Sequence, residues 1–451
     1  MSERQSEIKL KKWKNKALAR QIENKKLKHR LGEVSQSRDN WKQKYQQLFK
    51  SSKQVDLPQT KAFGHQYPVS VVLFIVLLQQ YGQMSLRCCR HCMICISLLG
   101  LTLRVPSHNS IRNWVCKCGY YRVHKRNDLS ASYVLYVDES ISFGSEKILL
   151  ILGIPTEKIP VGRSVQHGDV EVLYVGIGQS WTGENIATIL ANIGIKILIS
   201  YLVSDEGTNL KKAYQLGDYV HISDCTHILS NILKGFYQAD TRFEAFRSAV
   251  GKVRQSFYLS KEKSQFLPPT LRGKLRFINI FSCVDWATKC LAMWETLPEK
   301  TRQSLAFLQT QQGFIEELSE QGIIFKKVCE ILKNKAFSTS SKNEIFQELT
   351  QFGKTERAKL FIQKIQIYLT ILEQKLQHLN LQTCLCCSDI IESCFGKFKQ
   401  KINPNNKNQL SEFVYTLANF TKDFDAKEVK MALENVKIKD LKITKSESKT
   451  G

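Results

Sequence analysis

The sequence has few acidic residues for its size. Its 451 residues include 41 Asp and Glu against 66 Lys and Arg, which gives a net charge of +25. This imbalance says little about the fold, but it favours a polyanionic partner. Residues 1–50 hold 15 Lys and Arg against 5 acids, so this segment carries +10 of the excess. The positive charge is therefore concentrated near the N-terminus.

Long apolar runs are also missing. The longest, VSVVLFIVLL at residues 69–78, is about half the length that a membrane-spanning helix needs. The first residues, MSERQSEIKLKKWK, are highly charged and contain no apolar signal-peptide core. No glycine-rich nucleotide loop, internal repeat or low-complexity segment appears. We therefore expect a soluble intracellular protein of the cytoplasm or nucleoid, with no membrane partner.

In that setting the 14 cysteines are expected to be thiols rather than disulfides. Cys92 and Cys95 have the spacing of zinc ligands, and Cys116 and Cys118 could complete such a site. Alternatively, Cys88, Cys92 and Cys95 lie on one helical face as small hydrophobic residues. A second well-spaced CxxC pair is missing, which favours the hydrophobic interpretation.

Residues 1–50 are predicted to form a basic coiled coil. Between residues 8 and 50 the heptad positions, spaced three and four apart, are Leu10, Trp13, Ala17, Arg20, Asn24, Leu27, Leu31, Val34, Arg38, Trp41, Tyr45 and Leu48. Nine of these twelve are apolar, and a polar Asn at such a position can fix register and strand number. We expect a homodimer or higher oligomer whose arm also contacts DNA. The alternative is a single amphipathic helix packed on the body. Residues 51–67 are expected to be a linker.

Residues 68–128 are patterned as several helices and are predicted to form a helix-turn-helix-like DNA-binding domain. Near its end, Ser107 or Asn109 can cap a helix. The side chains expected to face inward are Ile111, Trp114 and Val115, and those expected to face outward are Arg112, Asn113 and Lys117. Such an open polar face suits a recognition helix in the major groove of double-stranded DNA, although many surface helices have the same pattern.

From Ser132 the periodicity changes to that of an α/β fold. The expected strands are 133–138, 147–154, 170–177, 197–204 and 219–223. Three helices are expected: one that begins after Thr182, one at 207–216 and one at 226–236. The order β-β-β-α-β-α-β-α predicts a mixed β-sheet with flanking helices on both faces. Residues 238–380 are patterned as helices throughout, and a further helix is expected at 388–402. Residues 426–451 are expected to be a frayed, Lys-rich tail.

Two acids stand where predicted strands end. Asp138 and Asp205 each follow a buried β-branched run, and ligands of α/β sheets gather at such strand ends. Neighbouring carboxylates repel and need a cation, and their hard oxygens favour Mg²⁺ or Mn²⁺. Glu392 is the candidate third ligand, because Lys399 lies two helical turns later on the same face. The alternatives are that each Asp is a turn former, and that Asp389 replaces Glu392.

These positions carry a resemblance to a known family. The order of the elements, with Asp138 on the first strand, Asp205 after the fourth and Glu392 on a late helix, resembles the RNase H-like catalytic domain of DDE transposases, in the retroviral integrase superfamily. The chain is similar to the insertion-sequence type that carries a helical insertion before the catalytic Glu. The resemblance places the first part of the catalytic domain at 130–237, an all-α insertion at 238–380, and the last catalytic helix with a C-terminal helix at 381–425.

Two short motifs add to the resemblance. Asp224-Cys-Thr-His227 is similar to the C/D-x-x-H motif that follows the second Asp in several transposase groups. Glu392 and Lys399 match the E and K of the Y-R-E-K signature of one insertion-sequence class. Its Y and R are replaced here by Leu385 and Ser388. The resemblance therefore extends to the superfamily rather than to that class.

The resemblance implies a metal-dependent DNA transposase. Asp138, Asp205 and Glu392 would bind two Mg²⁺ or Mn²⁺ ions, and the enzyme would cut phosphodiester bonds at element ends and join them to target DNA by transesterification. The residues expected to hold phosphate or contact DNA near the site are His227, Lys397 and Lys399. Two alternatives remain: an RNase H-like nuclease that cuts without joining, and a catalytically inactive DNA-binding relic of a mobile element.

Overall fold

The computed structural model describes residues 28, 31–43, 60–98, 104–125, 131–140, 144–258, 260, 263–270, 277–402, 410–442 and 445–446. The chain divides into two units, Met1–Thr60 and Lys61–Gly451. In the first unit, residues 31–43 are helical, and Leu31, Val34 and Trp41 are 71%, 62% and 63% exposed. The side chains at these three predicted heptad positions are therefore exposed to solvent in the single chain. Most of the predicted coiled coil and linker lies outside the described residues.

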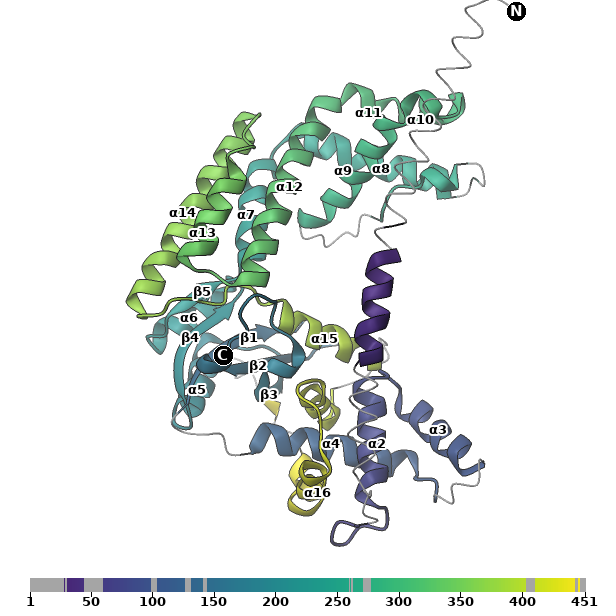
Figure 1. Ribbon diagram of the computed structural model, residues 1–451, viewed down its shortest axis with the longest axis vertical. Helices are drawn as coiled ribbons and strands as arrows, with labels where there is room; N and C mark the ends of the chain where they lie inside the picture. Colours follow the sequence, from purple (N-terminus) through teal and green to yellow (C-terminus); the bar gives the residue numbers. More distant parts are fainter. Residues whose placement is uncertain are drawn as a thin grey trace, which may run out of the picture. The chain divides into compact units, whose positions relative to one another are not determined.

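A mixed sheet forms the centre of the second unit (Figure 1). Its strands are β1 (Ser132–Glu139), β2 (Lys147–Pro155), β3 (Glu171–Gly178), β4 (Leu198–Ser204), β5 (His221–Ser223) and β6 (Lys445–Ser446), in the spatial order β5-β4-β1-β2-β3-β6. Strands β1, β2 and β3 pair antiparallel, whereas β4 pairs parallel with β1 and with β5. The helices between the strands are α5 (Gly183–Gly194), α6 (Thr208–Leu216) and α7 (Cys225–Tyr237). This confirms the α/β class and the predicted element order.

Helices cover both faces of the sheet because β1 is apolar on both sides. Val134 and Tyr136 belong to one buried cluster, which includes residues of α7 and of α15 (Asp389–Lys401). The side chains between them on the strand, at Leu135 and Val137, belong to a second cluster with α5 and α6. Because side chains alternate along a strand, Asp138 continues the Tyr136 side, toward α7 and α15.

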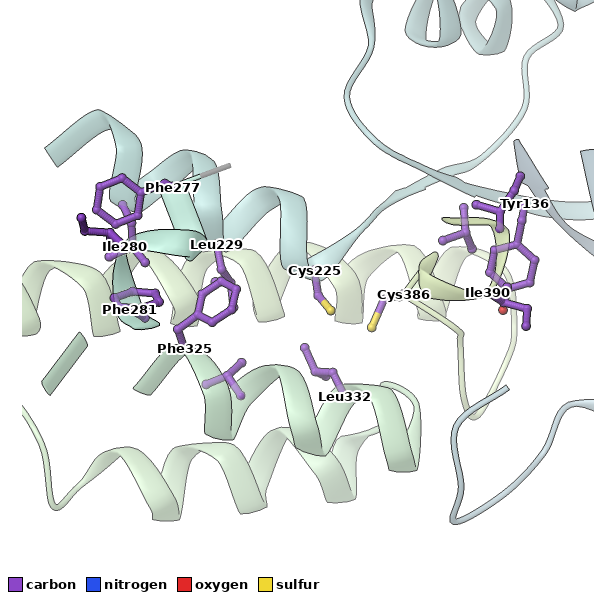
Figure 2. Close-up of a cluster of buried hydrophobic side chains, with 14 of the residues drawn as sticks. Tyr136, Cys225, Leu229, Phe277, Ile280, Phe281, Phe325, Leu332, Cys386 and Ile390 are labelled. Carbon is purple, nitrogen blue, oxygen red and sulfur yellow. The ribbon is translucent and has the colours of Figure 1, made fainter. Parts of the chain in front are cut away.

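The described part of residues 238–380 is helical, as predicted. Its helices are α8 (Thr241–Tyr258), α9 (Ile280–Ala292), α10 (Glu299–Leu305), α11 (Phe307–Thr310), α12 (Gln312–Lys335), α13 (Thr339–Leu349) and α14 (Glu356–His378). Helices α7, α12, α13 and α14 run side by side (Figure 1). Their core is continuous with one face of the sheet: Figure 2 shows Cys225 and Cys386 between Leu332 on one side and Tyr136 with Ile390 on the other.

The described part of the predicted tail, residues 426–442 and 445–446, is not frayed. After η6 (Glu412–Phe420), residues 426–441 form α16 (Ala426–Asn435) and the short η7 (Ile438–Leu441). These pack with α2 (Val69–Gln80), α3 (Leu86–Leu98) and α4 (His108–His124) around one core. The prediction of a frayed tail was wrong because it rested on the lysine content alone. The apolar residues have helical spacing, and those buried are Val429, Ala432, Leu433 and Val436. No helix in the described ranges has the length and apolar character needed to cross a membrane.

Candidate active site

Strand pairing brings the two predicted aspartates to one edge of the sheet. Asp138 lies near the end of β1, opposite Leu150 of β2. Asp205 directly follows β4, which runs parallel to β1 as its neighbour. Because parallel neighbours end on the same edge, both carboxyl groups reach the same region. The two strands that carry these aspartates are therefore neighbours in the sheet.

Two helices add the remaining predicted residues. Glu392 lies in the first turn of α15, which packs against β1. His227 lies in the first turn of α7, and its Nε2 is 3.3 Å from Oε1 of Glu392. The side chain of Glu392 is 34% exposed and that of His227 is 23% exposed, so the pair is accessible from solvent. Residues 165 positions apart are thus brought into contact.

The three acids share one electrostatic environment. Burial, then Asp205, then Glu392 raise the pKa of Asp138 to about 7, and His227 opposes this shift. Like charges near a buried carboxyl disfavour its ionised form, and a divalent cation would favour that form again. The three acids are nevertheless spaced more widely than the donors of a single-ion cage: among the described residues, the donor atoms that all lie within 4.8 Å of one another belong to Asp224, Cys387 and Asp389.

That tighter group has a structural explanation. Asp224 is 1% exposed, and its Oδ1 accepts a hydrogen bond of 2.8 Å from the backbone N–H of His227. Its Oδ2 accepts from the N–H and the hydroxyl of Ser388, at 2.6 and 2.8 Å. Asp389 forms an ion pair with Lys333. Both carboxylates are therefore already engaged, and we assign Asp224 a bridging role rather than that of a metal ligand.

Asp224 joins the starts of α7 and α15. It caps the first turn of α7, which contains His227, and it holds Ser388, directly before the first turn that contains Glu392. A backbone hydrogen bond of 2.8 Å from Cys225 to Cys386 reinforces the junction. Sequence reasoning gave Asp224 only as the first residue of the Asp224-Cys-Thr-His227 motif and missed its contact with Ser388. The position of Asp224 three residues before His227 is a capping signal that the sequence contains. Its other partner, Ser388, is 164 residues away in the sequence and could not be recognised from it.

The turn after β4 uses one oxygen of Asp205. The N–H of Gly207 donates a hydrogen bond of 3.0 Å to Oδ1 of Asp205, so the alternative of a turn former applies to this oxygen. Ser204 donates to the backbone oxygen of Asp205 at 2.8 Å, and its Oγ also lies 3.0 Å from Nε2 of His221. Tyr214 is buried beside this turn, and burial raises the pKa of its hydroxyl. The loop holding Asp205 is therefore well ordered by local contacts.

Of the two α15 lysines predicted to contact DNA, Lys397 differs from the prediction. Lys397 is half-buried with its ammonium group 5.9 Å above the ring of Phe420, and burial lowers its pKa. Its packing inward is a correction to the expectation of a DNA-contacting side chain, because α15 buries this face against η6. Lys399 is half-buried, two turns after Glu392 on the same helix.

The predicted recognition helix is covered. Helix α4 packs against η6 and α16, so Lys117 is 8% exposed and donates a hydrogen bond to the carbonyl of Leu433 at 3.2 Å. Arg112 forms an ion pair of 2.6 Å with Glu412, and Asn113 is half-buried. The expectation of an open face is wrong for Arg112 and Lys117, because the C-terminal segment contacts both side chains.

The cysteines behave as small hydrophobic residues or exposed thiols. Cys116 and Cys118 are buried, and burial raises the pKa of each thiol. Cys92 is half-buried and Cys95 is exposed, and the metal-donor group found in the described residues contains none of these four predicted zinc ligands. The zinc interpretation therefore gains no support.

No protein-family sequence model matches this chain, and no curated protein is detectably similar to it.

Proposed function

We propose that the protein is a DNA transposase of the DDE type, with an RNase H-like catalytic domain of the retroviral integrase superfamily. The observation that carries the proposal is the convergence of Asp138, Asp205, Glu392 and His227 at one end of the sheet. They come from β1, the end of β4, α15 and α7, elements far apart in the sequence.

The order of the elements supports the same proposal. Three antiparallel strands are followed by two parallel strands with alternating helices, and the helix carrying Glu392 comes after a long all-helical region. This arrangement resembles the one expected of an RNase H-like domain with an insertion before its last acid. Fold likeness alone does not determine activity. The proposal therefore depends on the site.

The donor set fits a hard divalent cation. Asp138, Asp205 and Glu392 would hold two Mg²⁺ or Mn²⁺ ions. Burial and the negative charges of Asp205 and Glu392 raise the pKa of Asp138, and such ions would compensate this effect. When bound, they would supply activation of water and stabilisation of the leaving oxygen in phosphodiester cleavage and transfer. The wide spacing of the acids is compatible with more than one ion.

The protein's own groups would orient the substrate. Glu392 accepts a hydrogen bond from His227 when Nε2 carries the proton, which fixes the imidazole beside the acids. His227 would then present a polar ring edge to a phosphate at the site. Asp224 holds the two helix ends that carry this pair. Lys399, on the same helix as Glu392, would add positive charge for the DNA backbone.

A cleavage and joining assay tests the proposal. The substrate is a labelled duplex taken from the DNA that flanks the gene, including any inverted repeats, with Mg²⁺ and the full-length protein. We expect nicking of the wild-type substrate, joining of pre-cut 3′-hydroxyl ends to a second duplex, and a loss of about 10³-fold or more in Asp138→Asn and Glu392→Gln. Asp389→Asn, one turn earlier on α15, is the matched control and should keep its activity.

Other outcomes separate the alternatives. Cleavage without joining of the pre-cut ends would identify a nuclease, whereas DNA binding without cleavage would identify an inactive relic. Equal activity of wild type, Asp138→Asn and Glu392→Gln would disprove the assigned site.

A further inference from the structure

The N-terminal part of the second unit lacks acids altogether. Residues 57–127 contain no Asp or Glu and 9 Lys or Arg. Four of these cations are engaged by the C-terminal segment: Arg112 with Glu412 at 2.6 Å, Lys117 with the carbonyl of Leu433 at 3.2 Å, and Arg122 and Lys125 with Glu428 at 2.7 and 3.9 Å. These contacts take up the positive charge of α4. They do not extend to α3.

The turn between α2 and α3 is short and specified by sequence. Gly82 has no room for a side chain, because an added Cβ would lie 2.7 Å from the carbonyl oxygen of Leu78. The next residue, Gln83, has φ of +50°, and the amide of Gln79 donates to the carbonyl of Met84 at 3.0 Å. Two helices joined by a tight turn of this kind form a helix-turn-helix unit, in which the second helix contacts DNA.

Helix α3 presents a basic outer face. Its buried residues are Cys89 and Met93, on the side that packs against α2 and α4. Arg87, Arg90 and His91 are exposed in its first half, and neither arginine forms an ion pair with another described residue. Arg87 and Arg90 are three residues apart and so lie side by side on the helix.

We infer that α3, rather than α4, is the helix that enters the major groove of duplex DNA, with Arg87 and Arg90 at the base edges. The first residues of a recognition helix contact the bases, and an arginine fork matches O6 and N7 of guanine. Residues 57–127, which include α3, contribute no acid of their own that would repel the phosphate backbone. This inference rests on the proposed function only in taking DNA as the partner, and it does not depend on catalysis.

The test is a selection from a random library of 30-base-pair duplexes with full-length protein, followed by anisotropy on the selected and a scrambled duplex at two salt concentrations. Arg87→Ala/Arg90→Ala should lose about tenfold or more of the preference for the selected duplex. Arg87→Lys/Arg90→Lys keeps the charge, so it should keep the salt dependence and still lose most of the preference.

Controls make the result specific to α3. Arg247→Ala/Arg302→Ala removes an exposed arginine from α8 and a half-buried one from α10 and should keep the preference. Thermal unfolding should be unchanged in all three double variants. The inference is overturned if the α3 variants keep the wild-type preference, if Asn113→Ala on α4 removes it instead, or if the wild type selects no sequence. Asp138→Asn separates the two proposals: it should select the same duplex, whether or not the wild type cleaves DNA.

Discussion

At the scale of single residues, Asp224 illustrates how a buried carboxylate positions others. Its two oxygens accept three hydrogen bonds, from His227 on one side and from Ser388 on the other. Burial raises its pKa while these bonds oppose the shift, so the ionised form depends on them. Glu392 and His227 both lie in the first turns of helices whose ends Asp224 holds.

Asp224→Asn should therefore impair catalysis more than folding. An asparagine keeps an acceptor for the N–H of His227 but places an amide donor against the N–H of Ser388. We expect about 2 kcal/mol of destabilisation and a fall in the DNA cleavage rate of roughly 10²-fold from the misplaced pair. DNA affinity should be unchanged. Both quantities are measured on the same preparation, by urea unfolding and by single-turnover cleavage.

Ser388→Ala is the matched control for this prediction. It removes the hydroxyl bond of 2.8 Å but keeps the backbone N–H at 2.6 Å, so its effect on both quantities should be smaller. A cleavage rate that falls only in proportion to stability in both variants would mean that Asp224 is structural alone.

Sequence reasoning predicted the acids of the candidate site but not the residues that support them. Asp138 and Asp205 could be predicted because each follows a β-branched run that had to be a buried strand. Glu392 could be predicted from its helix and from Lys399. The partner of Asp224 could not, because the contact with Ser388 is fixed only by the packing of α7 and α15. Local patterns predict which residues are near a strand end, and tertiary packing decides what they touch.

At the scale of elements, the contact between α4 and η6 explains why the predicted recognition face was wrong. The amide of Asn419 donates to the carbonyl of Val115 at 2.8 Å, and the Arg122 guanidinium donates to the carbonyls of Thr421 and Lys422 at 2.5 and 2.8 Å. It also lies 3.3 Å above the ring of Phe424. The amphipathic pattern of residues 107–124 was read correctly as a helix, but its polar face meets protein rather than solvent.

Gly119 permits this close approach, and Gly119→Ala should break it. An added Cβ would fall inside van der Waals contact with the carbonyl of Tyr415 and 3.2 Å from Oδ1 of Asn419, so η6 would have to move. Alanine favours a helix by about 1 kcal/mol over glycine, but we expect a net loss of about 1–3 kcal/mol from overpacking. Urea unfolding at fixed pH measures this change.

Gly235→Ala in α7 provides the contrast, because nothing lies within 4 Å of the added Cβ. There the helix preference should act alone and stabilise the protein by up to about 1 kcal/mol. Stabilisation of similar size in both variants would show that η6 does not press on α4 in solution.

At the scale of the whole molecule, segments distant in sequence complete each other. The C-terminal helices close the core of α2, α3 and α4, and the final described strand, β6, pairs with β3. Lys422 also donates its backbone N–H to the carbonyl of His167 at 3.3 Å, which ties this segment to the loop before β3. Composition could not predict that residues 426–441 pack onto α2, α3 and α4. The many lysines of this segment predicted a solvated tail, whereas the apolar residues between them are buried.

Two half-buried histidines, His167 and His221, make this assembly sensitive to acid. Burial and then Lys375 lower the pKa of His221 to about 4, and burial and then Lys397 lower that of His167 to about 4. The pKa of an unfolded histidine is about 6.5. Between these values the unfolded chain binds protons that the folded chain does not, so stability falls as pH drops from about 6.5 to 4. The raised pKa of Asp138 acts in the opposite direction over pH 7 to 4, because there the folded chain takes up the proton first.

A comparison with His221→Gln isolates one of these contributions. Glutamine can still bond to Ser204 but does not titrate, so any packing loss beside Tyr214 is the same at every pH. Between pH 7 and 4.5 the wild type should lose on the order of 2 kcal/mol more stability than the variant, after allowance for solvent screening of a partly exposed ring. Urea unfolding across this range measures the difference. The terms from Asp138 and His167 are common to both proteins and cancel, so parallel pH profiles would mean that His221 accepts its proton in the folded state as readily as in the unfolded chain.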